Sequence, residues 1–402
     1  MSMTHRSAAL WVLLGFFVAP GWSQSEDPAG ELAPAMSGQL GAKAPGKVGA
    51  MTWSAQLGFY DRSDSGGASG NPFLDESLTV IEPMLIFDHQ VSEDFGYDVK
   101  FSYDKVSSAS IERLSKFDAQ SGASGDDYVS LDAGFRHRLT DQDNASWHLG
   151  LSSEYDYFSL GLGTGWSHSF DGRDAVLSLN LNGFYDQVKP IRFDGTQDAN
   201  ETRTSVAGTL GWYQVLSPKM HGEFGVTYSA QSGFLETAYN AVVVEDPLAP
   251  PNPHLANQAK GFEFTEELPG SRGRLALFGR LRRMLSEHDA VELGTRIYDD
   301  SWGIGAYDVT PHYLHEFQSG LLLDLKYRYY SQTAADAFAE HFTTLPEYRT
   351  QDSDLGAFDS SLFGAHFQFG IGSPVWDFGI NYLSRSDGLD HMFLSIGWTK
   401  SY

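Results

Sequence analysis

Three observations predict an all-β fold for this chain of 402 residues. From Thr52 to the C-terminus, stretches of roughly ten residues alternate apolar and polar side chains, which is the period of a β-strand. Short and long connections follow one another between these stretches. After the N-terminal segment, no apolar run approaches the ~20 residues of a spanning helix. The fold class expected is a transmembrane antiparallel up-and-down β-barrel of about sixteen strands, within a range of roughly 14–18, with short periplasmic turns and long extracellular loops.

Residues 1–23 have the pattern of a secretory signal peptide. A basic start precedes an apolar core from Ala8 to Ala19, and small residues follow near the expected cleavage point. The core is too short for a membrane anchor. Residues 24–50 lack periodicity and are rich in Ala, Gly and Pro, so we expect a flexible periplasmic segment that is a linker or a plug. The expected organisation is therefore a signal peptide (1–23), this segment (24–50) and an outer-membrane barrel (51–402).

The composition excludes several classes of protein. The chain has no cysteine, which excludes a disulfide scaffold, cysteine-ligated metal and covalently attached haem. Its formal net charge of -25 argues against binding to nucleic acid or to anionic lipid surfaces. Its 42 glycines suit the crowded, strongly twisted strands of a barrel.

The clearest strands follow one another along the whole chain. In 175–186, for example, Leu177, Leu179 and Leu181 alternate with Ser178 and Asn180. The cleanest alternating stretches are 147–155, 175–186, 290–298, 321–330 and 375–383.

The connections between strands sort into two kinds that alternate. The short, turn-like ones are near 89–94, 140–145, 171–174, 216–219, 286–289, 315–320 and 370–374. The others are the long loops 61–76, 107–126, 187–203, 231–271 and 332–356, with tight members near Asp156, Asp300 and Asp387. Short turns on one rim and long loops on the other are typical of an outer-membrane barrel with both termini on the periplasmic side.

One face of the strands is apolar and the other carries many charges. Alternation alone fits a soluble barrel as well as a membrane barrel, in which the charged face lines the lumen. The residues expected to line the lumen are Asp98, Lys100, Asp132, Arg136, Arg138, Glu154, Glu223, Arg280, Arg282, Glu292, Arg296, Asp308, Asp324, Lys326, Arg328 and Asp377. Their mixed signs predict either a satisfied salt-bridge network or a transverse field that orients a passing solute.

Two features of the apolar face indicate that it contacts lipid and not a protein core. The apolar face ends in aromatic residues that suit interfacial girdles: Trp147, Tyr155, Tyr327, Tyr329, Trp398 and Tyr402. His137, His168 and Lys400 interrupt it only beside the short-turn rim, where a polar group costs ~0–1 kcal/mol. The last strand, with Leu394, Ile396, Trp398 and Tyr402, is the expected C-terminal signal for the barrel-assembly machinery.

Two prolines fit the strand pattern poorly. Pro83 and Pro311 fall where strand interiors are expected. Because a closed barrel has no free edge, each predicts a bulge or an early strand end.

No catalytic, cofactor-binding or metal-binding residue is assigned. His312 and His315 fall on opposite faces of a strand, as do Ser167 and His168, so neither pair forms a metal site or a nucleophile with its base. The aspartates of "DRSDSGG" and "SGDDY" lack a complete calcium-binding spacing. We therefore expect a protein that is not an enzyme and has no cofactor.

Several stretches together resemble a known family. They are "SSEYDYFSLGLGTGWSHSFDGRDAVLSLNL", "GTLGWYQVLSPK", "SGFLETAYNAV", "LPGSRGRLALFGRLRR", "RIYDDSWGIGAYDVTPHY" and "DLKYRYYSQTAADAF". The chain resembles the domain-of-unknown-function family DUF3570 of Gram-negative outer-membrane β-barrel proteins over nearly all of 50–402. The resemblance implies a barrel without assigned catalytic residues and, from the proteins encoded nearby, a lipoprotein or redox partner.

These observations predict an uncharacterised outer-membrane barrel, located in the cell outer membrane, that acts as a porin-like channel for small solutes. The alternative is a scaffold or sheath around a periplasmic or surface partner, such as a lipoprotein or a redox assembly. An outer-membrane enzyme is a remote alternative. The expected partners are outer-membrane lipid, lipopolysaccharide and the barrel-assembly machinery, and no nucleic acid.

Overall fold

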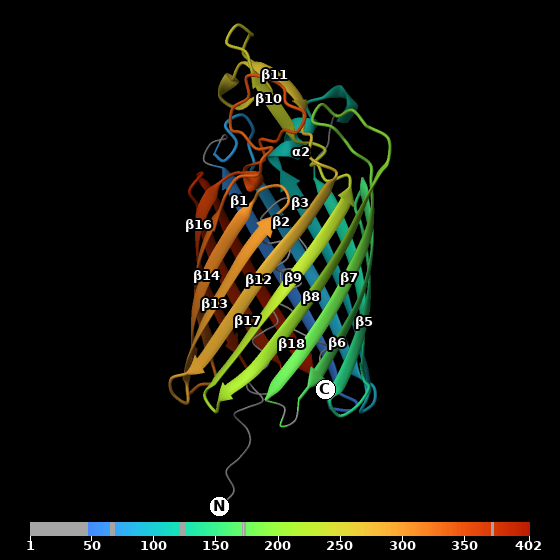
Figure 1. The fold of residues 1–402 in the computed structure, drawn as a ribbon, viewed down its shortest axis with the longest axis vertical. Coiled ribbons are helices and arrows are strands. Elements are labelled where there is room, and N and C mark those ends of the chain that lie inside the picture. Colours follow the sequence, from blue (N-terminus) through green and yellow to red (C-terminus); the bar gives the residue numbers. More distant parts are fainter. Residues whose placement is uncertain (1–46, 65–68, 121–124, 171, 173, 371–373) are drawn as a thin grey trace, which may run out of the picture.

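A closed β-barrel forms the body of the molecule (Figure 1). The computed structural model describes residues 47–64, 69–120, 125–170, 172, 174–370 and 374–402, so the predicted signal peptide and most of 24–50 lie outside the described residues. Within the described chain, sixteen antiparallel strands pair in sequence order, and the last pairs with the first. The barrel strands are β1 (Met51–Asp64), β2 (Leu78–Gln90), β3 (Phe95–Ser108), β4 (Asp126–Arg138), β5 (Asp143–Ser153), β6 (Tyr157–Ser169), β7 (Ala175–Val188), β8 (Glu201–Ser217), β9 (Met220–Gly233), β12 (Ser271–Met284), β13 (Asp289–Asp300), β14 (Gly305–Glu316), β15 (Leu322–Gln332), β16 (Phe358–Phe369), β17 (Val375–Arg385) and β18 (Leu389–Ser401). The predicted fold class is confirmed.

The remaining elements lie in the long loops. They are the helix α2 (Ala109–Leu114), the two-stranded sheet β10 (Ala241–Glu245) with β11 (Gly261–Thr265), and the 3₁₀ turns η2 (Asp118–Gln120), η4 (Ala256–Gln258) and η5 (Ser353–Leu355). No helix in the described part of the chain is long and apolar enough to cross a membrane. The sequence predicts long loops over 107–126 and 231–271, and neither α2 nor the β10–β11 hairpin is predicted.

The two faces of each strand differ as the alternation predicts. In β7, Ser178 and Asp186 are buried, whereas Leu179, Leu181 and Tyr185 are exposed. The same outward exposure of Leu, Val, Ile and Phe recurs from β1 to β18. Because a closed sheet has one inner and one outer face, the buried polar parity faces the interior and the apolar parity forms the outer surface. A continuous apolar outer surface is what a barrel surrounded by lipid requires.

The C-terminal strand closes the barrel. Ile396 pairs with Leu57 and Trp398 with Ala55 of the first strand, and the Tyr402 N–H donates to the Met51 carbonyl at 2.9 Å. Every edge of the sheet is thereby paired, so the barrel exposes no edge strand. This closure explains why the alternation continues to the end of the chain.

Both prolines lie inside continuous strands, which corrects the predicted bulge or strand end. The pairing of β2 with β3 stops after Ile81 and resumes at Met84 in an unchanged register, while Pro83 stays paired with Leu57 of β1. The pairing of β14 with β15 opens beside Pro311 in the same way. Proline has no N–H to donate, so each one opens the ladder toward one neighbour only.

The two rims differ as predicted. Short turns close the end at which β18 finishes, and the long loops, α2 and the β10–β11 hairpin gather at the other end (Figure 1). In barrels of this kind the long loops are extracellular. His137, His168 and Lys400 lie beside the short-turn end, where β4, β6 and β18 finish.

Candidate functional site: the charged lumen and its cap

The interior of the barrel carries the predicted charged residues. All of them except Glu154 lie within barrel strands on inward-facing positions, and Glu154 directly follows β5. They are Asp98, Lys100, Asp132, Arg136, Arg138, Glu154, Glu223, Arg280, Arg282, Glu292, Arg296, Asp308, Asp324, Lys326, Arg328 and Asp377. The strand register brings many of them into contact with one another.

Arg136 is the centre of one ion-pair group near the short-turn end. Its two terminal nitrogens each lie 2.8 Å from an oxygen of Asp88, and Nη1 lies 3.4 Å from Asp98. Its Nε donates to the side chain of Gln90 at 3.2 Å. The side chain is 4 % exposed, so this bidentate pair is buried against the wall and does not project into the lumen. Gly96 permits the approach, because a Cβ there would lie 2.6 Å from Arg136.

A second group joins β9, β12 and β13. Arg280 lies 2.8 Å from Glu223 and 3.9 Å from Glu292, and Arg282 donates to Glu292 at 2.6 Å. Nearer the long-loop rim, Arg296 pairs with Asp308 of β14 at 3.3 Å. At the level of Glu292, Asp324 lies 2.9 Å from His312. The predicted cross-strand ladder of mixed charge is present on these strands.

Carboxylates outnumber cations on β2, β3 and β4. Glu82 and Asp104 face each other where Pro83 opens the ladder, and one oxygen of each is buried without a hydrogen-bond partner among the described residues. Lys100 is paired in register with Asp132. It interacts electrostatically with Glu82, Asp104 and Asp132. This part of the wall is therefore net negative.

Loop segments 69–77, 109–120, 234–270 and 333–357, which we call the cap, pack together at the long-loop rim (Figure 1). Phe73 of segment 69–77 and Val243 and Leu255 of segment 234–270 form one apolar cluster between these two loops. A larger cluster joins the cap to the inner ends of strands: Leu268, Ala276, Tyr298, Trp302, Ile304, Ala306, Tyr330, Ala335, Leu355 and Phe358. Loops that share buried clusters form a packed unit and not separate mobile segments.

Gln351 links three parts of the cap. It is 1 % exposed. Its carbonyl accepts from Asn71 Nδ2 at 2.9 Å, its Oε1 accepts from the Val243 N–H at 2.7 Å, and its Nε2 donates to the Glu340 carbonyl at 2.9 Å. A buried amide with all these partners fixes the relative positions of the loops.

Two arginines on barrel strands hold the cap to the wall. Arg385 of β17 pairs with Asp354 and Asp387 and donates to the Ser353 carbonyl at 3.0 Å. Arg62 of β1 lies 3.3 Å from Asp354. Both Arg385 and Asp354 have side chains that are 2 % exposed, so the pair is fully desolvated. Removing one partner of such a pair is costly because the other charge stays buried.

Three buried carboxyls lie in the cap, two of them close enough to these arginines to interact electrostatically. Burial raises the pKa of Glu76 to about 8, against the opposing effect of Arg62. Burial also raises the pKa of Asp352 to about 7 and that of Glu266 to about 8, and nearby carboxylates add to both shifts. Glu266 accepts from Thr350 Oγ1 at 2.6 Å. At neutral pH part of this cluster is therefore protonated.

A cavity of about 260 Å³ lies between the cap, strands β1–β4 and the turn that joins β5 to β6. Its acidic lining residues outnumber its basic ones. The lining carboxylates are Asp75, Glu76, Asp104, Asp126, Glu154, Asp156 and Asp352, and the lining cations are Arg62 and Arg113. The cavity therefore has a net negative charge, which favours positively charged groups.

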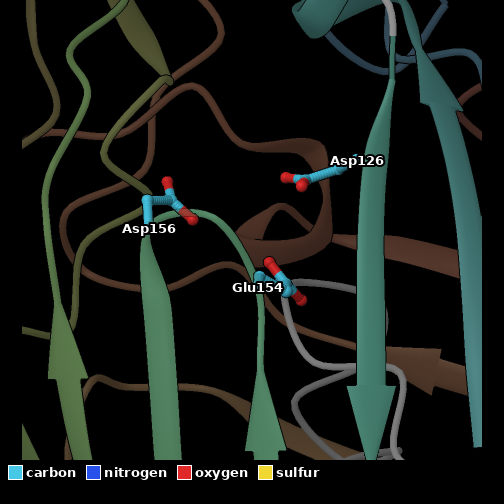
Figure 2. Close-up of side chains that lie close together, drawn as sticks. All are labelled: Asp126, Glu154 and Asp156. Carbon is cyan, nitrogen blue, oxygen red and sulfur yellow. The ribbon is translucent and has the colours of Figure 1, made fainter.

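Asp126, Glu154 and Asp156 gather at one side of this cavity (Figure 2). Their carboxylate oxygens lie within 4.8 Å of one another. Burial and the neighbouring Asp126 raise the pKa of Asp156 to about 6. Oxygens at this spacing could hold a divalent cation, but exposed carboxylates cluster in this way without one, so the cluster alone does not define a metal site. Asp126 belongs to the "SGDDY" stretch that the sequence singles out. The sequence signal for its two neighbours is the tight turn near Asp156, which places Glu154 and Asp156 together at this rim.

The histidine pairs behave as the strand period predicts. His312 bonds to Asp324 on the inner face, whereas His315 bonds to Asp289 at 2.8 Å on the outer face. Likewise Ser167 is buried, and His168 pairs with Asp143 at 2.9 Å on the opposite face. Neither pair forms a nucleophile with its base.

Solved structures of several barrels resemble the chain at low identity. A mutant ferric enterobactin receptor (PfeA) from Pseudomonas aeruginosa is 12% identical with a TM-score of 0.44; the match covers 85% of this chain and 54% of that one. A bacterial polysaccharide outer membrane secretin is 9% identical with a TM-score of 0.48, covering 87% and 98%. The CymD monoaromatic hydrocarbon channel is 10% identical with a TM-score of 0.41, covering 92% and 97%. The chain thus spans about half the length of the receptor, and at these TM-scores the matches carry no argument about function.

The comparison with curated proteins gave no match. The geometry is that of an outer-membrane β-barrel, with an apolar outer surface, sorted loops and a strand that closes on the first. A family model described as "Protein of unknown function (DUF3570)" matches residues 33–388, and the chain belongs to this family.

Proposed function

We propose that the protein is a channel that conducts small solutes across the outer membrane. The observation that carries this proposal is a closed sixteen-stranded barrel whose inward positions are charged and whose outer surface is apolar. A barrel of this strand number is wide enough for a water-filled path. Charged side chains on the inner wall keep such a path hydrated and give it selectivity.

In this proposal the cap acts as the gate of the channel. It lies over the long-loop rim and is held there by Arg62 and Arg385. A solute from outside must pass around or through the cap to reach the lumen. We therefore expect low conductance while the cap is packed and higher conductance when these ion pairs are broken.

Single-channel recording in planar lipid bilayers tests the proposal. The refolded full-length chain without its signal peptide is expected to give stepwise currents, and heat-unfolded protein provides the control. Heat-modifiable migration on a gel confirms that the sample is a folded barrel. A folded barrel that gives no current at any voltage, even with Arg385 replaced by Gln to loosen the cap, contradicts the channel.

The channel proposal has consequences for location and partners. It implies insertion into the outer membrane by the assembly machinery, contact of the outer face with lipid and lipopolysaccharide, and no catalytic role. Should the barrel prove silent, the scaffold for a lipoprotein or redox partner becomes the better proposal. A detergent pulldown that recovers such a partner at constant ratio would support it.

A further inference from the structure

Two walls of the barrel face each other across the lumen. The first consists of β2, β3, β4 and β5, which we call the acidic wall, and the second of β12, β13, β14 and β15, which we call the basic wall. Around the ring, the four strands β6–β9 separate the two walls on one side, and β16, β17, β18 and β1 separate them on the other. The two walls are therefore diametrically opposite.

The acidic wall carries six carboxylates and three cations on its inward positions. The carboxylates are Glu82, Asp88, Asp98, Asp104, Asp126 and Asp132, and the cations are Lys100, Arg136 and Arg138. Arg136 forms a bidentate ion pair with Asp88, which neutralises one carboxylate of this wall. Lys100 interacts electrostatically with Glu82, Asp104 and Asp132, so one lysine is shared among three carboxylates. The acidic cavity under the cap continues this wall to the extracellular end.

The basic wall carries seven cations and five carboxylates on its inward positions. The cations are Arg272, Arg274, Arg280, Arg282, Arg296, Lys326 and Arg328, and the carboxylates are Glu292, Asp300, Asp308, Glu316 and Asp324. Glu292 is shared by Arg280 and Arg282, and Asp324 bonds to His312 beside Lys326. Glu223 of the adjacent β9 also pairs with Arg280, and with Glu223 counted the cations still exceed the carboxylates by one.

In the described part of the chain, each group of four separating strands carries four charged residues on its inward positions, fewer than the nine of the acidic wall and the twelve of the basic wall. They are Asp186, Glu201, Arg203 and Glu223 on one side and Arg62, Asp64, Asp377 and Arg385 on the other. β6, β16 and β18 carry no Asp, Glu, Lys or Arg on their inward positions among the described residues. On β7 and β8, Asp186 pairs with Arg203 at 2.7 Å and the two charges cancel. Most of the charged side chains of the lumen thus lie on the two opposite walls, which creates a field across the path.

We infer that this lumen selects small zwitterionic solutes, which carry one cationic and one anionic group. The inference rests on the proposed channel. A solute with an ammonium group toward the acidic wall and a carboxylate or phosphate toward the basic wall gains favourable interactions at both ends. A neutral solute of the same size gains neither, and a singly charged ion is attracted by one wall and repelled by the other.

Paired variants of the reconstituted full-length protein test the inference. D98N/D132N neutralises two acidic-wall carboxylates and leaves Arg136 with Asp88 and Lys100 with Glu82 and Asp104. K326Q/R328Q neutralises two basic-wall cations and leaves Asp324 with His312. Reversal potentials in a KCl gradient should move toward anion selectivity for the first variant and toward cation selectivity for the second. We expect each permeability ratio to change by about two- to five-fold, because a unit charge 4–8 Å from the path acts through water with an energy near RT.

Liposome swelling measures the solute preference itself. The unmodified protein should admit 6-aminohexanoate several-fold faster than erythritol, a neutral solute of similar size, and both variants should reduce that preference. D141N/E287Q changes two charges in short turns outside the lumen and should leave selectivity and preference unchanged. Heat-modifiable migration confirms that each variant is folded.

The outcomes separate the two proposals. A conducting channel with equal rates for both solutes, or with both variants shifted in the same direction, overturns the zwitterion inference and leaves the channel standing. A folded barrel without conductance overturns both.

Discussion

Individual glycines decide how closely charged side chains approach the wall. Gly96 faces Arg136 across the β3–β4 pair, and a Cβ there would lie 2.6 Å from the Nε of Arg136 and the Oε1 of Gln90. The period of two predicts that Arg136 faces inward. It does not predict that the guanidinium lies flat over a glycine, because that depends on the partner strand and its register.

We predict that Gly96→Ala destabilises the barrel by about 1–3 kcal/mol, because the added methyl displaces the Arg136–Asp88 pair. Gly58→Ala is the matched control, since its nearest neighbour would lie 3.6 Å away in ordinary contact. Both changes reduce the flexibility of the unfolded chain equally, so their difference isolates the clash. Urea unfolding in lipid vesicles measures it. Equal midpoints for the two variants would remove the argument for close approach.

Proline affects a strand because it has no backbone N–H to donate to the neighbouring strand. Pro83 opens the ladder to β3 over two residue pairs without shifting the register, although the sequence predicted a bulge or a strand end. The pattern could not distinguish these outcomes. They depend on whether both neighbouring strands continue in register past the proline, which is a property of three strands together.

Pro83→Val should raise the free energy of unfolding by about 1 kcal/mol, because it restores one ladder N–H that can donate to β3. Pro83 faces outward, where valine is a suitable residue. The urea midpoint of the folded barrel reports the change. A lower midpoint would mean that the open ladder serves another purpose, such as spacing Glu82 from Asp104.

The cap is the element that the sequence predicted least well. Its contacts join residues far apart in the chain, as when Asn71 donates to Gln351. The loops have no periodicity that would indicate such pairs, and α2 and the β10–β11 hairpin are short enough to be overlooked in a polar loop. The alternation of short and long loops, in contrast, follows from counting strands.

We predict that Arg385→Gln loosens the cap and leaves the barrel closed. The substitution leaves Asp354 buried with Arg62 as its remaining cation, and breaking such a pair costs about 3–5 kcal/mol of local stability. Proteinase K should cut within 333–357 faster, while heat-modifiable migration is retained. Arg283→Gln, at an exposed position beside the opposite rim, provides the control and should not change the cleavage rate.

The cap should also loosen as the pH rises. The pKa values of Glu76, Asp352 and Glu266 are raised by burial to about 8, 7 and 8, so the packed cap holds protons that the opened cap releases. The stability of the cap therefore falls as the pH rises from about 4 to about 8. Cleavage within 333–357 should be slowest near pH 5 and fastest above pH 8. Glu76→Gln, which removes one of these ionisations, should flatten the profile; an unchanged profile would contradict the assignment to this cluster.

At the scale of the whole molecule, the sequence predicts the strand number, the closure and the sorting of the rims. These follow from period-two alternation and turn spacing, which are local signals repeated along the chain. The excess of carboxylates on one wall and of cations on the other needs the ring order as well, because strands distant in sequence such as β3 and β13 face each other only once the barrel closes.

Everything else depends on the environment of the outer surface, and single-cysteine labelling along β7 tests it most directly. The chain has no native cysteine, so one cysteine at a time can replace Leu179, Asn180, Leu181 or Asn182 without removing another. Spin labels at 179 and 181 in reconstituted vesicles should be accessible to oxygen dissolved in lipid, and labels at 180 and 182 to a water-soluble nickel complex. If labels on both faces were equally accessible to the nickel complex, the apolar side chains would lie in water or within protein, and the membrane barrel would be contradicted.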